Sequence, residues 1–435
     1  MPPLRRVALA FSLISVAATV VAPPALATGP ILSGLAKPVK VTTLKPGLVQ
    51  YRYKLLVNDD GVRRTQTLYK IVWSYPSTRI ALHSAVLGSE SNGWIRENPI
   101  SSWAQWSQPG GLVAAINGDM FNDQFPVGEP DGLLVHQRTV YDFGWGGPGV
   151  GYLPNGSMIM GRPKAVPALL KVGAHSVTVG VWNGKPLHDD QIGVYSGTSS
   201  VTVPSGFVGF AIDSTALLNL LHGSKAGFKF PSGSDVSETV SGFRFSVPGG
   251  KHTDVNLTLG QLAQCPNGGC PAGTVIPMPD GGVIALAKTG SIAATGLAAK
   301  VLANAPIGLA VDDNGWGSVT DTMGGKPQLV HNGSPQTTLL SYVDPWQWAY
   351  PHWRPAIVQK GTVAKGQGWM VLVGGAGAVG IRGSTFSRML VQMGATNAMG
   401  FDNNSSAELY RPGVTPVTAY GFEREIPAAT YLTFN

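Results

Sequence analysis

The sequence predicts an α+β fold with a mixed, strand-dominated sheet core and a few helices, preceded by a β-meander. Two observations support this prediction. The 435 residues include 57 glycines and 33 prolines, whereas only 13% are charged, a composition that favours turns over exposed charged helices. Short segments rich in β-branched and aromatic residues also alternate with turn sequences. We therefore expect many short strands joined by loops.

The N-terminal 27 residues have the pattern of a signal peptide. Arg5 and Arg6 precede an apolar run from Val7 to Val21, and a small-residue cleavage site ends at Ala27. This run is too short to favour a permanent span, which needs about 20 apolar residues. We expect cleavage after Ala27, with an uncleaved anchor as the alternative. The mature protein is then secreted, extracellular or associated with a cell wall, without a stable membrane span.

The mature chain is long enough for one large domain or two ordinary ones. We divide it into a β-rich lead-in at residues 28–110 and a main domain at residues 111–435. The formal net charge of +7 becomes +5 when Arg5 and Arg6 are removed, and the remaining lysines and arginines are scattered. Nucleic-acid-binding proteins cluster such residues, so we expect no nucleic-acid partner. The positive charge favours an anionic partner only weakly.

The two cysteines of the chain, Cys265 and Cys270, flank the turn-forming sequence Pro-Asn-Gly-Gly. In an oxidising compartment a local disulfide is the expected result. A zinc site is the less favoured alternative, because no histidine or second cysteine pair is nearby.

The strand predictions begin with residues 51–57 and 68–73, joined by an Asx-Gly turn at 58–61, and continue with 79–87. These three segments form the predicted meander. An apolar strand at 112–116 then leads directly into Asn117-Gly118-Asp119, which places polar side chains at a strand end.

Two helices are predicted. The first is a small-residue helix at 291–303. The second has apolar residues at helical spacing, a capping hydroxyl before them and a glycine after them: Phe386, Met389, Leu390 and Met393, preceded by Ser384 or Thr385 and followed by Gly394. Strands at 369–373 and 398–401 flank the second helix, and the latter strand leads into a polar loop that begins at Asp402. Such loops commonly collect ligand-binding groups.

Four motifs stand in order along the chain: Ala114-Ala115-Ile116-Asn117-Gly118-Asp119-Met120-Phe121 with Gly128 and Asp131-Gly132-Leu133-Leu134-Val135; Met323-Gly324-Gly325-Lys326-Pro327-Gln328-Leu329-Val330-His331-Asn332-Gly333; Arg354-Pro355-Ala356-Ile357; and Gly394-Ala395-Thr396-Asn397-Ala398-Met399-Gly400-Phe401-Asp402. Together they resemble the phosphodiester glycosidase family. The best-known member of that family removes N-acetylglucosamine from the mannose-6-phosphate precursor of lysosomal enzymes. The resemblance covers most of the mature chain and implies that residues 111–435 form a hydrolase domain that cleaves a sugar-1-phosphodiester.

The chain departs from the family pattern after the last strand of the fourth motif. Relatives carry Asp-Gly-Gly-Gly-Ser there, whereas this chain has Asp402-Asn403-Asn404-Ser405-Ser406. Asparagine is the best substitute for a glycine with positive φ, but its side chain occupies space. The chain also has Gly374-Gly375 where relatives often carry Asp-Gly. Asp402 argues for activity, and the lost glycines argue for a changed substrate or lost catalysis.

Cleavage of a sugar-1-phosphodiester requires carboxylates near the anomeric carbon and a cation near the phosphate. The resemblance implies that Asp402 is the base or nucleophile, with Asp119 as the second candidate, and that Arg354 binds the phosphate. Each of these residues also has a common structural role as the alternative. An Asp at a strand end commonly forms a turn or caps a helix, and a lone Arg commonly forms a solvated ion pair.

The resemblance and the loop positions also predict substrate-binding residues: Asn117, Gly118, Gly324, Gly325, His352, Trp353 and Ser405. Aromatic residues between Trp346 and Trp353 are candidates for stacking on a sugar ring, with core packing as the alternative. His352 is a candidate proton shuttle, although a structural hydrogen bond is the commoner role. Glu408 is predicted to be an exposed strand residue, with a second catalytic carboxylate as the alternative.

No cofactor is expected. Asp312-Asp313-Asn314-Gly315 offers oxygen ligands in a turn, and calcium is a weak possibility there because the glutamate and the regular spacing of a calcium loop are missing. Two classes of function follow. The first is a secreted hydrolase acting on a phosphorylated glycan or cell-wall polymer, and the second is a non-catalytic carbohydrate-binding protein on the same scaffold.

Overall fold

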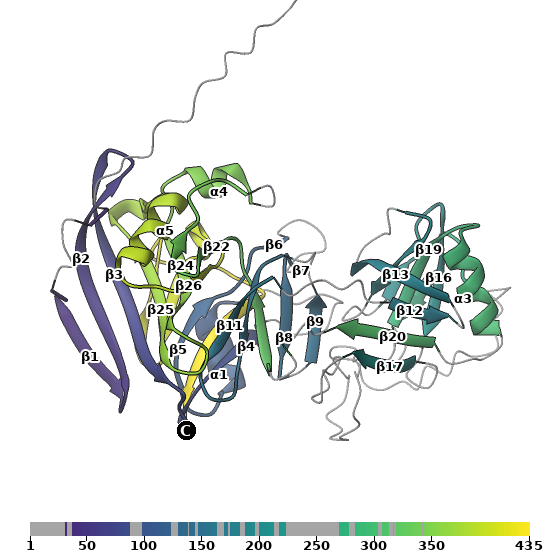
Figure 1. Cartoon of the computed structure of the whole chain (residues 1–435), viewed down its shortest axis with the longest axis horizontal. Helices are drawn as coiled ribbons and strands as arrows, with labels where there is room; N and C mark the ends of the chain where they lie inside the picture. Colours follow the sequence, from purple (N-terminus) through teal and green to yellow (C-terminus); the bar gives the residue numbers. More distant parts are fainter. Residues whose placement is uncertain are drawn as a thin grey trace, which may run out of the picture.

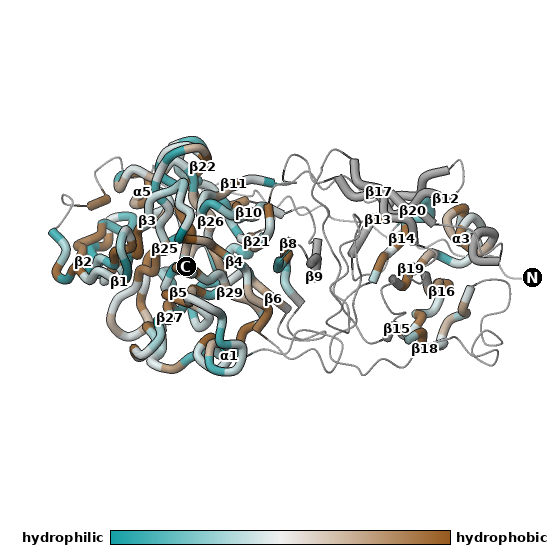
Figure 2. The backbone as a smooth tube through the Cα atoms, turned by 90° about the horizontal axis from the view of Figure 1, so that it is seen from below, coloured by the Kyte–Doolittle hydropathy of each residue, from teal (hydrophilic) through white to brown (hydrophobic). Residues whose placement is uncertain are grey.

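The computed structural model describes residues 31–32, 37–87, 98–122, 129–137, 139–143, 147–162, 169–172, 175–182, 188–195, 200–212, 217–222, 269–277, 283–302, 307–312, 316, 319–340 and 343–435. The predicted signal peptide lies outside these ranges. A larger and a smaller lobe are visible, and β8 (Leu133–His136) and β9 (Thr139–Phe143) lie between them in both views (Figures 1 and 2).

The larger lobe contains an eight-stranded sheet in which all neighbouring strands are antiparallel. In spatial order its strands are β1 (Lys40–Lys45), β2 (Leu48–Asp59), β3 (Val62–Tyr75), β25 (Gly366–Gly374), β24 (Arg354–Gly361), β26 (Asn397–Gly400), β22 (Gln328–His331) and β23 (Ser334–Pro335). The first three strands of the chain therefore share a sheet with strands from its C-terminal part.

Two five-stranded sheets accompany it. One has the order β28 (Val414–Thr418), β27 (Glu408–Arg411), β5 (Leu112–Asn117), β29 (Ala428–Phe434) and β4 (Ile80–Val86). The other has the order β11 (Met158–Gly161), β10 (Gly149–Tyr152), β21 (Asp321–Gly324), β8 and β9, and the short strands β6 (Phe121–Asn122) and β7 (Glu129–Pro130) form a separate pair.

The smaller lobe contains a seven-stranded sheet and α3 (Ile292–Leu302) (Figure 1). Its strands, in spatial order, are β16 (Phe207–Ile212), β19 (Val283–Lys288), β14 (Gln191–Tyr195), β13 (His175–Trp182), β12 (Leu169–Val172), β20 (Ile307–Asp312) and β17 (Leu217–His222). This sheet is mixed, because β13–β14 and β17–β20 are parallel pairs. The strands β15 (Ser200–Thr202) and β18 (Val275–Pro277) form a further pair.

A strand-dominated architecture with few helices is confirmed, and the meander is confirmed in modified form. The hairpin between β2 and β3 turns at Asp60 and Gly61, both with positive φ (52° and 90°), which suits a two-residue hairpin turn. The third strand of the meander is β1 and not the predicted segment 79–87. That segment forms β4, which instead pairs with β29 in another sheet.

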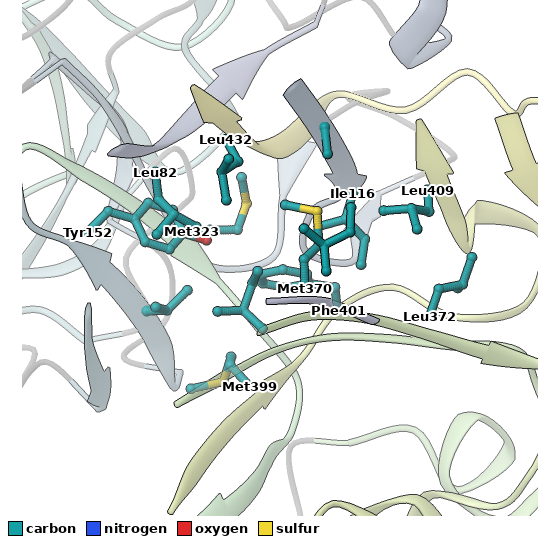
Figure 3. Packing of buried hydrophobic residues seen from close by; sticks show 14 of the residues in the cluster. Leu82, Ile116, Tyr152, Met323, Met370, Leu372, Met399, Phe401, Leu409 and Leu432 are labelled. Carbon is teal, nitrogen blue, oxygen red and sulfur yellow. The ribbon is translucent and has the colours of Figure 1, made fainter. Parts of the chain in front are cut away.

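The main core lies between the eight-stranded sheet and the five-stranded sheets. Because successive strand residues point to opposite faces, Met370 and Leu372 of β25 pack against this core together with Ile116 of β5. Phe401, at the end of β26, belongs to the same cluster and lies close to Met370 and Ile116 (Figure 3). The strand ends that carry the candidate site residues are thus held by a dry apolar interior.

The opposite face of the eight-stranded sheet is covered by α5 (Gly383–Gln392), whose Phe386, Met389 and Leu390 are fully buried. The helix and its end at Gly394 (φ 93°) are confirmed. The predicted cap is wrong, because the N-cap is Arg382, two residues before Ser384, and Arg382 makes no side-chain cap hydrogen bond.

In the part of the chain that the structure describes, the other helices are α1 (Ile100–Ser107) and α4 (Pro345–Ala349), with short 3₁₀ turns at Ala376–Ala378 and Asn404–Ser406. The predicted helix at 291–303 is confirmed as α3. Among the residues that the structure describes, none of the helices is both long and apolar enough to span a bilayer.

A buried carboxylate ties three strands of the larger lobe together. Asp321 at the start of β21 accepts hydrogen bonds from the backbone of Ser84 (3.3 Å) and Gln137 (3.0 Å). Its carboxylate also contacts His136 Nδ1 (3.1 Å) and His83 Nδ1 (3.5 Å). These two histidines hold the pKa of Asp321 well below its usual range although burial opposes this.

We expect Asp321→Asn to lower the free energy of unfolding by about 2 kcal/mol near neutral pH, because charge-assisted hydrogen bonds are lost. The folded-state pKa is depressed, so the contribution of Asp321 is fully present above the unfolded-state pKa of about 4, decreases below it, and is lost as the pH falls through the folded-state pKa. Denaturant unfolding at about pH 7 and about pH 3 measures this. Asp189→Asn, at a side chain that is 78% exposed, is the control. An equal deficit at both pH values would contradict the prediction.

Candidate active site

The predicted polar strand ends meet in space. Asn117 is the last residue of β5 and Gly118 follows it, whereas Asp402 follows β26, 285 positions from Asn117 along the chain. Asn117 Nδ2 donates to the carbonyl of Asp402 (2.7 Å), and the amide of Asp402 donates to the carbonyl of Gly118 (2.9 Å). These bonds place the Asp119 and Asp402 segments directly side by side.

A pocket of about 230 Å³ opens at this junction. Its lining comes from four separate segments: Met120, Phe121, Trp346, Gln347, Asp402, Asn403, Asn404, Ser405 and Arg424. Asn403 and Asn404 form part of the wall, yet they leave the hollow open. Asn404 has φ 58°, the left-handed conformation that asparagine tolerates best among non-glycine residues, as the substitution for a family glycine predicted.

Asp402 is the carboxylate that lines the pocket. It is only 8% exposed, and burial raises its pKa to about 6. The Ser406 hydroxyl and the Asn403 amide donate hydrogen bonds to it, and the Arg424 charge also stabilises the ionised form. The result is a carboxylate that is ionised at neutral pH but has lost most of its water shell, as a base or nucleophile requires.

Asp119 lies behind this pocket and is not part of its lining. Its Oδ1 accepts a hydrogen bond from the Met120 amide (2.8 Å), whereas Oδ2 is buried without a partner. Burial raises the pKa of Asp119 to about 8, although Lys326 opposes the shift. The carboxyl is therefore mostly protonated, and so uncharged, at neutral pH.

Two glycines make room for the Asp119 carboxyl. A Cβ atom at Gly324 would lie 2.2 Å from Asp119 Oδ2, and one at Gly132 would lie 2.3 Å from it. Gly324, which was predicted to bind substrate, instead contacts this buried carboxyl. Gly132 of the first motif and Gly324 of the second thus both leave space for the Asp119 carboxyl.

We expect Gly324→Ala to destabilise the protein by about 1–3 kcal/mol, because the added methyl group overlaps a buried carboxyl that has little room to move. Gly110→Ala is the matched control, since a Cβ there meets nothing within 4 Å. Denaturant midpoints of the two variants give the comparison. Equal midpoints would show that the surroundings of Asp119 accommodate the added methyl group without a loss of stability.

Arg354, the predicted phosphate clamp, donates its side-chain hydrogen bonds to backbone carbonyls. Its side chain is 4% exposed, and its N–H groups donate to the carbonyls of Ile381 (2.6 Å), Gln347 (2.7 Å) and Tyr350 (2.9 Å). It is absent from the pocket lining. Burial lowers its pKa to about 9. Arg354 therefore holds the loop after α4 against the loop before α5.

The cation in the pocket is Arg424, which the sequence analysis missed. Its Nη1 donates to the hydroxyls of Ser405 (3.2 Å) and Ser406 (3.1 Å), and its guanidinium lies 4.9 Å from the centroid of the Phe121 ring. No periodicity or motif in the sequence distinguishes Arg424 from the other scattered basic residues. Its position became apparent only from the three-dimensional neighbours Ser405 and Ser406.

The remaining predicted substrate-binding residues fall into two groups. Ser405 lines the pocket, and His352 lies beside it, with its ring centroid 4.2 Å from that of the lining residue Trp346. Burial lowers the pKa of His352 to about 4, so the ring is neutral at physiological pH. A neutral imidazole lacks the acidic second ring proton, so His352 does not fit the role of a general acid at neutral pH.

The other group is structural. Asn117 joins two strands and Asp402, since its Oδ1 also accepts from the Glu408 amide (3.1 Å). Gly118 and Gly325 contact the core, where added Cβ atoms would lie 2.7 Å from Met323 Sδ and 2.4 Å from Met399 Cγ. Trp353 is buried against Gly374 and donates from Nε1 to the Gly375 carbonyl (3.2 Å).

Three further predictions have different outcomes. Glu408 is not exposed: it is 1% exposed, and burial beside Glu423 raises its pKa to about 9. Cys265 lies outside the described residues, so the disulfide with the buried Cys270 stays a prediction. Residues 313–315 of the calcium candidate also lie outside, and the described residues contain no cluster of three metal-binding side chains.

Comparison with known proteins agrees with the motifs. Residues 246–433 match the family model of phosphodiester glycosidases. The second, third and fourth motifs lie within this range, whereas the first precedes it. The resemblance is therefore confirmed for the C-terminal part of the chain. No curated protein matches the chain.

Three solved structures match the chain, and the first two are similar to it in fold. A hypothetical protein from Synechocystis has a TM-score of 0.63 at 16% identity, covering 92% of this chain and 64% of that chain. A protein of Burkholderia pseudomallei described as exported has a TM-score of 0.51 at 15% identity, covering 85% and 74%. The catalytic domain of zebrafish N-acetylglucosamine-1-phosphodiester alpha-N-acetylglucosaminidase, auto-inhibited by its pro-peptide, has a TM-score of 0.39 at 10% identity, covering 92% and 87%.

Proposed function

We propose, from the match of residues 246–433 to the family model of phosphodiester glycosidases, that the chain hydrolyses a sugar-1-phosphodiester at the pocket of Asp402. One observation carries the proposal. A partly desolvated carboxylate, Asp402, and a guanidinium, Arg424, line the same pocket although they come from separate loops. These are the two charges that this reaction requires.

The reaction breaks the bond between the anomeric carbon and the phosphate oxygen. The phosphate leaves with the bonding electrons, and a water oxygen ends on the sugar. Asp402 acts at the anomeric carbon, either as the nucleophile or as the base that activates water. Arg424 offsets the charge that develops on the phosphate. A phosphate is a better leaving group than an alcohol, so the demand for a strong general acid is modest.

Asp119 supplies the second carboxyl of this proposal. Its raised pKa keeps it protonated at neutral pH, and it is held beside the Asp402 segment by the hydrogen bonds of Asn117 and Gly118. A proton held there lowers the negative charge behind the pocket. It therefore favours the approach of an anionic phosphodiester.

We expect kcat/KM to rise as the pH increases through about 6, because Asp402 must be ionised and its pKa is raised to about 6. Above about pH 8 the rate is expected to fall, because Asp119 then loses its proton and adds a second negative charge. A pH–rate profile of Asp119→Asn should lose the fall at high pH and keep the rise at low pH. A parent profile without a rise near pH 6 would exclude Asp402 as the ionised group.

The proposed substrate is a phosphorylated glycan or cell-wall polymer outside the cytoplasm. The signal-peptide pattern at residues 1–27 supports export, and intact mass of the protein recovered from culture medium tests cleavage after Ala27. A cytoplasmic protein of full length would contradict this part of the proposal.

A non-catalytic carbohydrate- or cell-wall-binding protein is the second candidate, and Asn403 and Asn404 in the pocket wall favour it. Reducing-sugar release from the methyl diesters of glucose, mannose and N-acetylglucosamine 1-phosphates separates the two. Turnover of any of them supports the enzyme. Binding of these diesters without turnover supports the second candidate.

A further inference from the structure

Two pairs of exposed aromatic side chains are connected to the wall of the pocket, one through the lining residue Trp346 and the other through a hydrogen bond to the lining residue Asn404. Trp346 and Tyr350 belong to α4 and the residue after it, and Tyr420 and Phe422 follow β28. They are 47%, 55%, 47% and 62% exposed. The ring centroids are 6.1 Å apart within each pair. We call these four residues the aromatic rim.

Asn404 connects the two pairs. Its Oδ1 accepts a hydrogen bond from the Tyr420 hydroxyl (2.7 Å). On the other side, a hydrogen bond joins its side chain to His352, on whose ring Trp346 packs at 4.2 Å. Asn404 and Trp346 both line the pocket. The aromatic rim is therefore continuous with the pocket that contains Asp402.

The chemistry around the rim favours a carbohydrate over an apolar ligand. The C–H bonds of a sugar ring give it an apolar face that packs on an aromatic ring, whereas its hydroxyl groups need hydrogen-bond partners. The pocket wall beside the rim supplies amide and hydroxyl groups from Gln347, Asn403 and Ser405. Exposed aromatic clusters bordered by polar groups usually mark a binding surface.

The size of the pocket argues that the ligand extends beyond it. A volume of about 230 Å³ is below the roughly 300–1,000 Å³ of sites that enclose a drug-sized ligand. Such a pocket accommodates one sugar with its phosphate group, and any further sugar ring must lie outside the pocket mouth. The exposed rings of the rim, which join the pocket wall at Trp346 and Asn404, offer a surface for such a ring.

We propose that the aromatic rim is a subsite for sugar rings of a glycan chain on the far side of the cleaved phosphodiester, so that the substrate is an oligosaccharide or polysaccharide and not an isolated sugar diester. The position of the subsite next to the cleaved bond rests on the proposed function. The binding of a glycan at the rim does not require turnover and can be measured without it.

The test measures binding in Asp402→Asn protein, which holds substrate without cleaving it if the proposed function is correct. The probes are yeast phosphomannan fragments of several sugars and the methyl diester of mannose 1-phosphate. We expect the fragments to bind at least about tenfold more tightly than the methyl diester, and Trp346→Ala combined with Phe422→Ala to remove most of this ratio.

Trp106→Ala is the matched control, because Trp106 is 57% exposed but is not part of the pocket lining. It should keep the full ratio. The substituted rim side chains are exposed, so the fold is expected to tolerate their loss, and circular dichroism checks this. Equal affinity for fragments and methyl diester in the parent, or an unchanged ratio in the rim variant, would overturn the proposal.

The two proposals fail in different ways. If the parent turns over the methyl diester but shows no preference for longer fragments, the subsite proposal is wrong and the hydrolase proposal stands. If the fragments bind through the rim but the parent cleaves neither probe, the subsite stands and the hydrolase proposal is wrong.

Discussion

Asp402→Asn is expected to lower kcat by about 10³-fold or more, because it removes the group that acts at the anomeric carbon while keeping its shape. Asparagine still accepts hydrogen bonds from Ser406 and from the Asn403 amide, so the loop should remain in place. The free energy of unfolding should change little or even rise, since a buried carboxylate that costs desolvation becomes neutral.

The matched control for this variant is Asp189→Asn, which neutralises a surface carboxylate paired with Lys288 (3.0 Å). It should retain parental kcat. Turnover of a sugar-1-phosphodiester measures both variants under the same conditions. Turnover in Asp402→Asn within a few fold of the parent would remove Asp402 from the mechanism, even if the protein is an active hydrolase.

The second large effect separates two arginines. Arg424→Ala is expected to lower kcat/KM about 100-fold with a small loss of stability, because it removes the pocket cation. Arg354→Lys is expected to lower the stability and to change kcat/KM little. It is expected to destabilise the protein by about 3 kcal/mol, because a lysine cannot reproduce the planar set of donors that now reaches three carbonyls.

Kinetics and denaturant unfolding of both variants complete this comparison. The correctly folded fraction of Arg354→Lys should retain much of the parental kcat/KM. If Arg354→Lys instead loses activity at full stability while Arg424→Ala remains active, the phosphate lies at Arg354 and our assignment of the two arginines is reversed.

The parts of the site that could be predicted from the sequence are those at the ends of apolar strands. Asp119 and Asp402 each follow a short buried strand, so their backbone position depends on local pattern alone. Their pairing was implied by the family motifs. The structure accounts for it through β27, which pairs with β5 and connects the Asp402 loop to the sheet that carries Asn117.

Two of the differences between the predicted and the observed site concern arginines, and both have the same cause. The function of a guanidinium depends on which acceptors surround it. For Arg354 these are backbone carbonyls at the end of α4 and at Ile381, just before α5. Neither periodicity nor spacing encodes that. Arg424 is positioned by Ser405 and Ser406 through contacts that depend on the folded chain.

Contacts between distant segments of the fold could not be predicted from local patterns either. The hairpin of β2 and β3 and the helix α5 were predicted because their signals are local. The partner of β4 is β29, at the far end of the chain, and a strand pattern does not name its partner. The separate seven-stranded sheet of the smaller lobe also went unpredicted, because its strands are similar in pattern to those around them.

We propose that the chain cleaves the bond between the sugar and the phosphate oxygen at the pocket of Asp402 and Arg424. Hydrolysis of a sugar-1-phosphodiester in ¹⁸O-labelled water, followed by mass spectrometry of the phosphomonoester, tests it directly. Attack at the anomeric carbon leaves the phosphomonoester unlabelled and puts the label on the sugar. A labelled phosphomonoester would show attack at phosphorus and contradict the account.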